Sequence, residues 1–202
     1  MHIPEGFLDI KTLAVTDGVA GVLLILSAKK VEKDISSEKV TKMGIATAFV
    51  FAVNMFAFPV AGGTSAHLTG VVLISVILGG WEGFICSSVA LFLQAILFQH
   101  GGILSLGANI LNISGWGALL GSIARRFKKF NPIIGGISSF LAVILGSITC
   151  AYELYLSGRG SFLRGTTAMA VGNFFPAVID GVITFFVLKF LKKELRVEAQ
   201  SN

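Results

Sequence analysis

The first two residues of the chain, Met1 and His2, place three nitrogen donors side by side. The α-amine of Met1 and the backbone nitrogen of His2 close a five-membered ring on a metal ion. The imidazole Nδ1 of His2 then closes a six-membered ring. An α-amine has a pKa of about 7.7–8.0, so a metal displaces its proton near neutral pH. Because the bulky His2 disfavours removal of the initiator methionine, we expect Met1 to remain and predict a chelate here.

A planar chelate of this kind needs a fourth donor, and the chain has only two further histidines, His67 and His100. We predict His67 as the fourth ligand. His100 is either a partner that orients a ligand or an alternative ligand. Four nitrogens in one plane favour Ni(II) or Cu(II) and disfavour tetrahedral Zn(II). The same histidines would also suit a haem-containing or metal-containing membrane enzyme, which is kept as an alternative.

The composition is typical of a membrane protein, with 54% hydrophobic and 13% charged residues among 202. Soluble domains average about 25% charged residues. A helix needs about 20 apolar residues to cross the hydrocarbon of a bilayer. We therefore predict an all-α polytopic bundle of about seven transmembrane helices, a single domain over 1–202 with a cytoplasmic tail at 189–202. The predicted spans are 12–28, 43–59, 67–80, 83–99, 108–124, 132–152 and 167–188.

Basic residues separate by side when the chain is threaded through these spans. All but three of the 16 Lys and Arg residues fall in 29–42, 125–131 or the region from 189 onward. Cytoplasmic segments carry such an excess. The C-terminus is therefore predicted in the cytoplasm and the N-terminus outside, on the side of all three histidines. Since membrane orientation accounts for the net charge of +5, no nucleic-acid partner is expected.

Several polar side chains near the predicted external face are candidates for orienting the metal ligands. A metal-bound imidazole usually donates its other ring N–H to an acceptor, which fixes its tautomer and direction. Asn109 is also placed to bond an amino-terminal segment. Two carboxylates, Asp17 and Asp180, fall within spans, where ionisable groups are costly and often functional; packing, coupling and attraction of the cation all stay open for them. The orienting candidates are Glu5, Ser65, Gln94, His100 and Asn109.

Three segments of the chain resemble one known family. They are MHIPEGFL at 1–8, GGTSAHLTG at 62–70 and QHGGILSLGANILN at 99–112. In this order they are similar to motifs of the substrate-binding membrane subunits of nickel/cobalt energy-coupling-factor (ECF) transporters, the NikM/CbiM family, and the similarity runs over most of the chain. The resemblance implies that Met1, His2 and His67 hold Ni(II) or Co(II), with the amino-terminal segment inserted into the bundle from outside.

The resemblance also implies a function and partners. The function is high-affinity capture and import of Ni(II) or Co(II) in a prokaryotic cell membrane, with Ni(II) preferred and no cofactor besides the transported ion. The partners are a transmembrane coupling (T) protein, two cytoplasmic ABC ATPases and a small accessory membrane protein. The chain lacks a GxxxxGK[ST] phosphate loop, so it is expected to be no enzyme and to leave ATP hydrolysis to those partners. A standalone cation channel or secondary transporter is the remaining alternative, although no repeat or filter-like loop is found.

Overall fold

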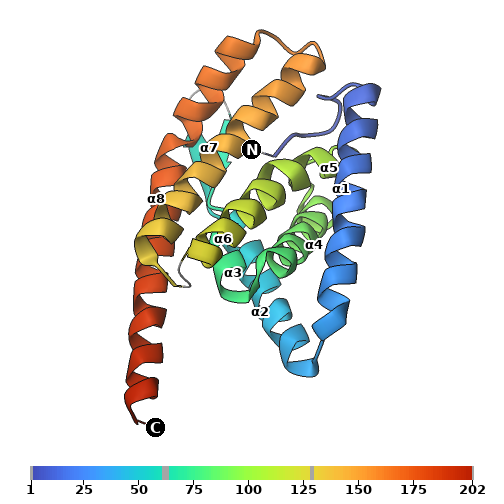
Figure 1. The fold of residues 1–202 in the computed structure, drawn as a ribbon. Coiled ribbons are helices and arrows are strands. Elements are labelled where there is room, and N and C mark those ends of the chain that lie inside the picture. Colours follow the sequence, from blue (N-terminus) through green and yellow to red (C-terminus); the bar gives the residue numbers. More distant parts are fainter. Residues whose placement is uncertain (1, 61–63, 128–129, 202) are drawn as a thin grey trace.

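The computed structural model describes residues 2–60, 64–127 and 130–201, which form a bundle of helices with one short hairpin (Figure 1). Two of the connections between described helices have an unusual backbone: a β-hairpin joins α2 to α3, and a π-helical turn joins α5 to α6. The elements are α1 Ile10–Val31, α2 Ser37–Asn54, β1 Ala57–Val60, β2 Thr64–His67, α3 Val71–Leu78, α4 Gly80–Phe98, α5 Leu106–Asn109, the π-helical turn Ile110–Gly115, α6 Trp116–Phe127, α7 Pro132–Leu156 and α8 Phe162–Ser201; a short 3₁₀ turn, Glu32–Asp34, follows α1.

Within the described residues, four helical segments are long and apolar enough to cross a membrane: Ile10–Asp34, Gly80–Phe98, Pro132–Leu156 and Phe162–Glu194. Large apolar side chains point outward from them, for example Leu163 and Val171, which are 75% and 71% exposed. A surface so rich in apolar side chains suits contact with lipid rather than water. The chain is therefore a helical membrane protein, and the count of seven spans stays a prediction.

Side-chain caps define where three of the long helices begin. Asp9 accepts from the backbone N–H of Thr12 (2.8 Å) at the start of α1, and Ser36 accepts from the N–H of Lys39 at the start of α2. Asn131 caps α7, whose first residue is Pro132. Such residues bind N–H groups that have no partner within the helix, and proline is well suited to the first helical position.

The expectation of an all-helical chain is wrong between α2 and α3. The span predicted at 43–59 ends as a helix at Asn54, and the residues after it form β1, which pairs antiparallel with β2 so that Ala57 lies opposite His67. Pro59 explains the break, because proline lacks an N–H and disfavours helical geometry at the residue before it. The span predicted at 67–80 is helical only from Val71 to Leu78, after Gly70 at φ +64°.

Other predicted boundaries also move. The break expected at 79–83 is confined to Gly79 (φ +134°), and α4 begins at the next residue. The span predicted at 108–124 is an α-helix, a π-helical turn and a second α-helix in series. The span predicted at 167–188 belongs to the 40-residue α8, which also includes most of the segment predicted as a tail at 189–202. Lys, Glu and Leu in that segment are strong helix formers, so the helix continues.

The short helix α3 is held against α6 by residues without side chains. A Cβ at Gly117 would lie 2.5 Å from Val71 Cβ, and one at Gly121 would collide with Ser75. Small residues let two helices approach closely in membranes. This contact fixes α3, and with it the segment from His67 to Gly70 that leads into the helix.

The two ends of the bundle differ in what they carry. In Figure 1 the α1–α2 connection and the C-terminus lie at the lower end, whereas the amino-terminal segment enters the upper half between α7 and α5. The Lys residues of 29–42 and the end of α8 thus lie at the end away from the amino-terminal segment. This arrangement agrees with the separation of basic residues found along the sequence.

Candidate metal centre

The amino-terminal segment is bound inside the bundle through the backbone of Ile3. Ile3 is 1% exposed, and its N–H donates to Asn109 Oδ1 (2.7 Å). The side-chain Nδ2 of Asn109 donates back to the carbonyl of Ile3 (3.2 Å). The same carbonyl accepts from Ser105 Oγ (2.6 Å) and from the N–H of Gly102 (3.0 Å). Because a buried backbone group without a partner is costly, these bonds make burial of the segment favourable.

Two consecutive glycines allow this close approach. Gly101 has φ +81°, and a Cβ on it would lie 2.8 Å from Asn109 Nδ2 and 3.2 Å from His2 Cδ2. A Cβ on Gly102 would lie 2.8 Å from the backbone nitrogen of Glu5. Glycine is the residue used where a backbone must approach another one this closely. The loop after α4 is therefore a cradle, made by 101–109, for the first residues of the chain.

Further contacts hold the segment from both sides. The Glu5 carboxylate accepts from the N–H groups of Ile103 (2.6 Å) and Leu104 (3.1 Å). From the α7–α8 connection, Arg159 donates to the carbonyls of Gly6 (2.7 Å) and Phe7 (3.1 Å). Charge-assisted bonds of this kind are the stronger ones. They connect the entering segment to both the cradle and the α7–α8 hairpin.

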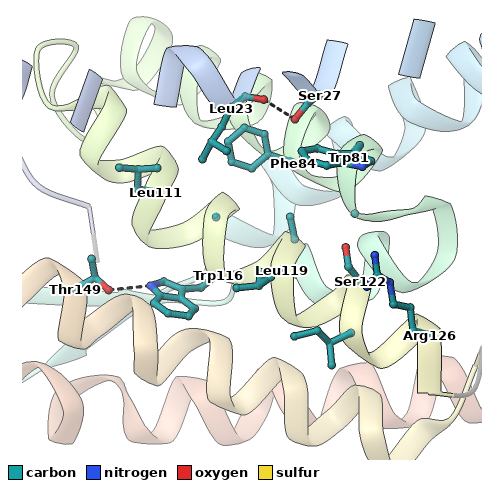
Figure 2. Close-up of a pocket in the computed structure, with 14 residues that line it drawn as sticks. Leu23, Ser27, Trp81, Phe84, Leu111, Trp116, Leu119, Ser122, Arg126 and Thr149 are labelled. Carbon is teal, nitrogen blue, oxygen red and sulfur yellow. Dashed lines mark hydrogen bonds between the residues drawn. The ribbon is translucent and has the colours of Figure 1, made fainter. Parts of the chain in front are cut away.

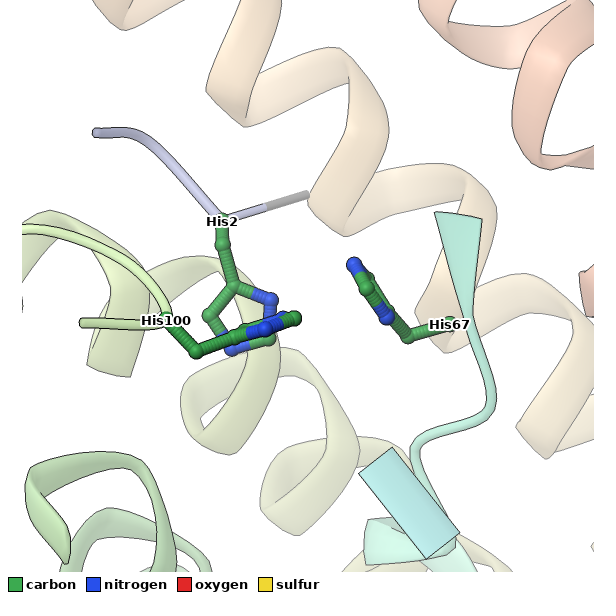
Figure 3. A group of neighbouring side chains, drawn as sticks. All are labelled: His2, His67 and His100. Atoms are coloured by element: carbon green, nitrogen blue, oxygen red, sulfur yellow. The ribbon is translucent and has the colours of Figure 1, made fainter. Parts of the chain in front are cut away.

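Three imidazoles meet where the segment ends. Figure 3 shows His2, His67 and His100 pointing toward one another from the amino-terminal segment, the end of β2 and the loop after α4. One ring nitrogen from each lies within 4.8 Å of the others. Ring centroids are 4.3 Å apart for His2–His100, 4.5 Å for His67–His100 and 5.0 Å for His2–His67. Two nitrogens on opposite sides of a bound ion are about 4 Å apart, so small movements would bring these donors onto one ion.

The polar atoms around this cluster fit a bound ligand. In the described part of the chain, both ring nitrogens of His2 and the Nε2 of His100 are buried without a hydrogen bond. The Oε1 of Gln94 and both amide atoms of Asn54 are buried in the same condition. Native proteins rarely leave so many buried polar groups unsatisfied unless an ion, water or functional role accounts for them.

Burial keeps the three imidazoles neutral. It lowers the pKa of His67 to about 3 and the pKa of His2 well below 6.5, and it also lowers the pKa of His100. Removal from water penalises the charged form and is the largest cause for each ring, and the positive charge of the α-amine adds to it. For His2 and His67 the neighbouring imidazoles add a smaller effect. A neutral imidazole has a free lone pair, which is the form that binds a metal. The site is therefore ready to bind a cation at neutral pH.

A buried carboxylate positions His67. Asp180 of α8 accepts from the N–H groups of Thr69 (3.0 Å) and Gly70 (3.1 Å) and from the Thr69 hydroxyl (2.8 Å). Ser139 of α7 also donates to it (2.8 Å). Asp180 thus ties the turn after His67 to α7 and α8, which gives this intramembrane carboxylate a structural role.

Asp17, the second carboxylate singled out from the sequence, supports the cradle. Asp17 of α1 accepts from the N–H of Gly107 (2.9 Å), and a Cβ on that glycine would lie 2.5 Å from the Cα of Asp17. Gly107 is two residues from Asn109, so α1 is bound directly to the segment that holds Ile3. Close packing of α1 and α5 therefore fixes one side of the candidate site.

The predicted site residues fall into different places. The structure brings His2, His67 and His100 together. Asn109 binds Ile3 of the segment that carries His2, and Glu5 of that segment binds the backbone of Ile103 and Leu104 in the cradle. Gln94 donates to the carbonyl of Phe51 (3.1 Å). Ser65 lies in β2 opposite Pro59, and Met1 lies outside the described residues.

Sequence reasoning missed several residues that act in the site: Ser105, the glycine pair at 101–102, Arg159 and Asn54. The glycines and Ser105 belong to the segment at 99–112 that carried the resemblance, so that motif was the available signal. Arg159 and Asn54 reach the site through contacts between distant parts of the chain, which no local pattern in the sequence indicates.

Comparisons with known proteins agree with this arrangement. A family model described as "Cobalt uptake substrate-specific transmembrane region" matches residues 2–197. A fused nickel transport protein, NikMN, of Rhodobacter capsulatus is 32% identical over 161 residues, which are 76% of this chain and 46% of that protein. This chain thus spans about half the length of that relative. The cobalt transport protein CbiM of Clostridium tetani is 30% identical over 215 residues, covering 98% of this chain and 88% of the relative.

The fold also matches a solved structure. A crystal structure of a truncated transition metal transporter superposes with a TM-score of 0.88 at 32% sequence identity. The superposition covers 96% of this chain and 99% of the other. The two proteins therefore share their fold over nearly the whole of this chain.

Proposed function

Because this chain belongs to the family of cobalt uptake substrate-specific transmembrane regions, we propose that it captures Ni(II) or Co(II) for import as the substrate-binding subunit of an ATP-driven ECF-type transporter. The metal would be taken up at the outer face of a prokaryotic cell membrane. A transmembrane coupling protein, two ABC ATPases and a small accessory membrane protein would be its partners. Transport of nickel or cobalt is the activity named for its relatives.

One observation carries the proposal: the amino-terminal segment is buried in the bundle and places His2 against His67. The cradle of 101–109 holds Ile3 through its backbone, so the position of His2 is set by main-chain bonds. A mobile tail would lose much conformational entropy on binding a metal. Preorganisation by the cradle removes most of that cost, which favours high affinity.

In the proposed site the donors are the Met1 amine, the backbone and imidazole nitrogens of His2, and the imidazole of His67. Four nitrogens of this kind suit a planar arrangement, which low-spin Ni(II) prefers, so Ni(II) should bind more tightly than Co(II). Binding releases protons from the amine and the backbone amide, and affinity should therefore fall with pH. His100, whose ring lies 4.3 Å from that of His2, would orient the His2 ring or approach the ion.

The direct test is to extend the chain before Met1. A short peptide fused to the amino terminus converts the α-amine to an amide and so removes the amine as a donor. We expect the extended protein to lose stoichiometric nickel binding, whereas the same peptide after Asn202 should leave binding intact. The readouts are nickel stoichiometry and the visible absorption of the loaded protein, which for planar Ni(II) is weak and accompanied by diamagnetism.

Three results would contradict the proposal. An amino-terminally extended protein that binds nickel with an unchanged spectrum would rule out the amine as a ligand. Import of metal at full rate by the purified chain in vesicles, without ATPase partners, would instead support a channel or secondary transporter. Purified protein with a strong Soret absorption band would identify a haem protein.

A further inference from the structure

A cavity separate from the histidine cluster lies between α1, α4, α6 and α7 (Figure 2). Its volume is about 530 Å³. Small-molecule sites usually have volumes of about 300–1,000 Å³, so the cavity is large enough for a small ligand. Most of its wall is apolar, with side chains that include Leu23, Phe84, Leu111 and Leu119. None of the three histidines lines it, so it is independent of the proposed metal site.

The polar groups of this cavity divide into two sets. Ser27 donates to the carbonyl of Leu23 (2.7 Å), and the indole of Trp116 donates to Thr149 (2.8 Å). These groups are satisfied within the protein. The second set, Ser122 and Arg126, lies one turn apart on α6, near Trp81 at one side of the cavity in Figure 2. The cavity therefore has an apolar length and a polar end, as an amphipathic ligand requires.

Arg126 is the group at that end whose charge is available. Within the part of the chain that the structure describes, it makes no hydrogen bond or ion pair. Its neighbour Arg125 is used internally, since it donates to the carbonyls of Val76 (2.6 Å) and Ile77 (2.7 Å). No acidic residue is among the described residues that line the cavity. The charge at this end is therefore positive and suits an anion.

The polar end lies on the basic side of the molecule. Glu82, next to Trp81 in the chain, is paired with Lys39 of the 29–42 segment (2.6 Å). That segment is predicted to be cytoplasmic. Tryptophan is enriched at the boundary between lipid and water, and basic pockets between membrane helices on the cytoplasmic side bind anionic headgroups. A lipid phosphate held at the level of Trp81 would therefore lie at the boundary between lipid and water, where headgroups lie in a bilayer.

We propose that this cavity binds one anionic phospholipid, with its phosphate at Arg126 and Ser122 and an acyl chain along the apolar wall toward Leu111. The phosphate accepts bonds from the Arg126 guanidinium and the Ser122 hydroxyl. The apolar wall covers methylene groups. A zwitterionic lipid would bring a cationic amine to an end that lacks an acidic partner, so the site should distinguish headgroups by charge.

The test is native mass spectrometry of the full chain, titrated with phosphatidylglycerol and, separately, with phosphatidylcholine. One phosphatidylglycerol should bind in preference. Arg126→Gln should weaken it by about tenfold or more, since charge-assisted bonds contribute about 1.5–3 kcal/mol. Lys193→Gln, which removes an exposed charge from the same side of the molecule, is the matched control and should have no effect.

A second variant blocks the apolar part. Gly115 lines the cavity, and a Cβ on it meets nothing closer than the carbonyl oxygen of Ile110 at 3.8 Å, so Gly115→Phe is chosen to fill part of the cavity. It should exclude the lipid while leaving nickel binding unchanged. Should this variant not fold, Arg126→Gln decides alone, because that side chain is exposed. Equal binding of both lipids, or unchanged phosphatidylglycerol affinity in Arg126→Gln, overturns the proposal. The proposal is also overturned if the native chain binds no lipid and Gly115→Phe loses a membrane partner that co-purifies with the native chain.

Discussion

Replacement of Asn109 by alanine tests whether the cradle determines metal affinity. Asn109 makes two hydrogen bonds to the backbone of Ile3, and its Oδ1 is the only described acceptor for the Ile3 N–H. In this variant the Ile3 carbonyl still accepts hydrogen bonds from the Ser105 hydroxyl and the Gly102 N–H. The substitution therefore leaves one buried donor without a partner, at about 1–3 kcal/mol, and removes one further bond of about 1 kcal/mol.

These terms give a total of about 2–4 kcal/mol against the inserted segment. If the segment must be inserted to bind metal, nickel affinity should fall by at least about 30-fold, since about 1.4 kcal/mol corresponds to tenfold. The assay is a competition titration with a chromophoric nickel chelator on detergent-purified protein. Asn109 is 1% exposed, so thermal unfolding should also show a loss of stability, and nickel affinity is compared at a temperature where the variant is folded.

The control is Asn131→Ala. Asn131 caps α7 at the N–H groups of Ile133 and Ile134, far along the chain from the cradle. Loss of a cap costs about 1 kcal/mol of stability but should not change nickel affinity. The reasoning is refuted if Asn109→Ala, folded as judged by its unfolding curve, binds nickel within about threefold of the native chain, a difference of roughly 0.6 kcal/mol.

Two more results are expected from the geometry of the site. Gly102→Ala should abolish nickel binding, because its Cβ would lie 2.8 Å from the backbone nitrogen of Glu5. Gly115→Ala is the control and should bind normally, since its Cβ meets nothing closer than 3.8 Å. The same chelator titration compares the two variants, and an equal loss of binding in both would exclude a local clash as the cause. The metal-free protein should become less stable as pH falls from about 6.5 toward 3. In this range the unfolded chain takes up protons that the buried His2 and His67, with their lowered pKa values, do not. The contribution of these two groups to stability is complete above the unfolded-state pKa, so the unfolding temperature should fall with falling pH, and His67→Gln should make this fall smaller. An unchanged fall would count against neutral buried imidazoles.

The sequence was most informative where chemistry is local. A histidine at position 2 beside an α-amine is a chelate by covalent connection alone, so donors can be predicted without a fold, and this donor set stays a prediction. Hydropathy identified apolar helices such as α4 and α7. The basic residues of 29–42 and of the end of α8 lie at one end of the bundle (Figure 1), and the orientation in the membrane stays a prediction.

The sequence was least informative where the backbone changes type without a change in polarity. The stretch around Ala57–Val60 is as apolar as the helix before it, and hydropathy does not distinguish a short buried strand from helix. Pro59 was the available sign and was overlooked. The partners of Asp180 are about 110 positions away in the sequence, so its role followed only from the packing of α3, α7 and α8.

The imidazoles of His2 and His67 are anchored mainly to different helices, and Arg159 of the α7–α8 connection joins the two sides through Gly6 and Phe7. His2 moves with the cradle and with α1, which Asp17 joins to Gly107. His67 moves with α7 and α8, which Asp180 joins to the turn before α3. A slide of the α7–α8 pair relative to α1 would widen the gap between the two rings, with the exposed bonds from Arg159 to Gly6 and Phe7 as the contacts that must yield. A force applied to the C-terminal end of α8 would in this way loosen the hold on an ion without unfolding a helix.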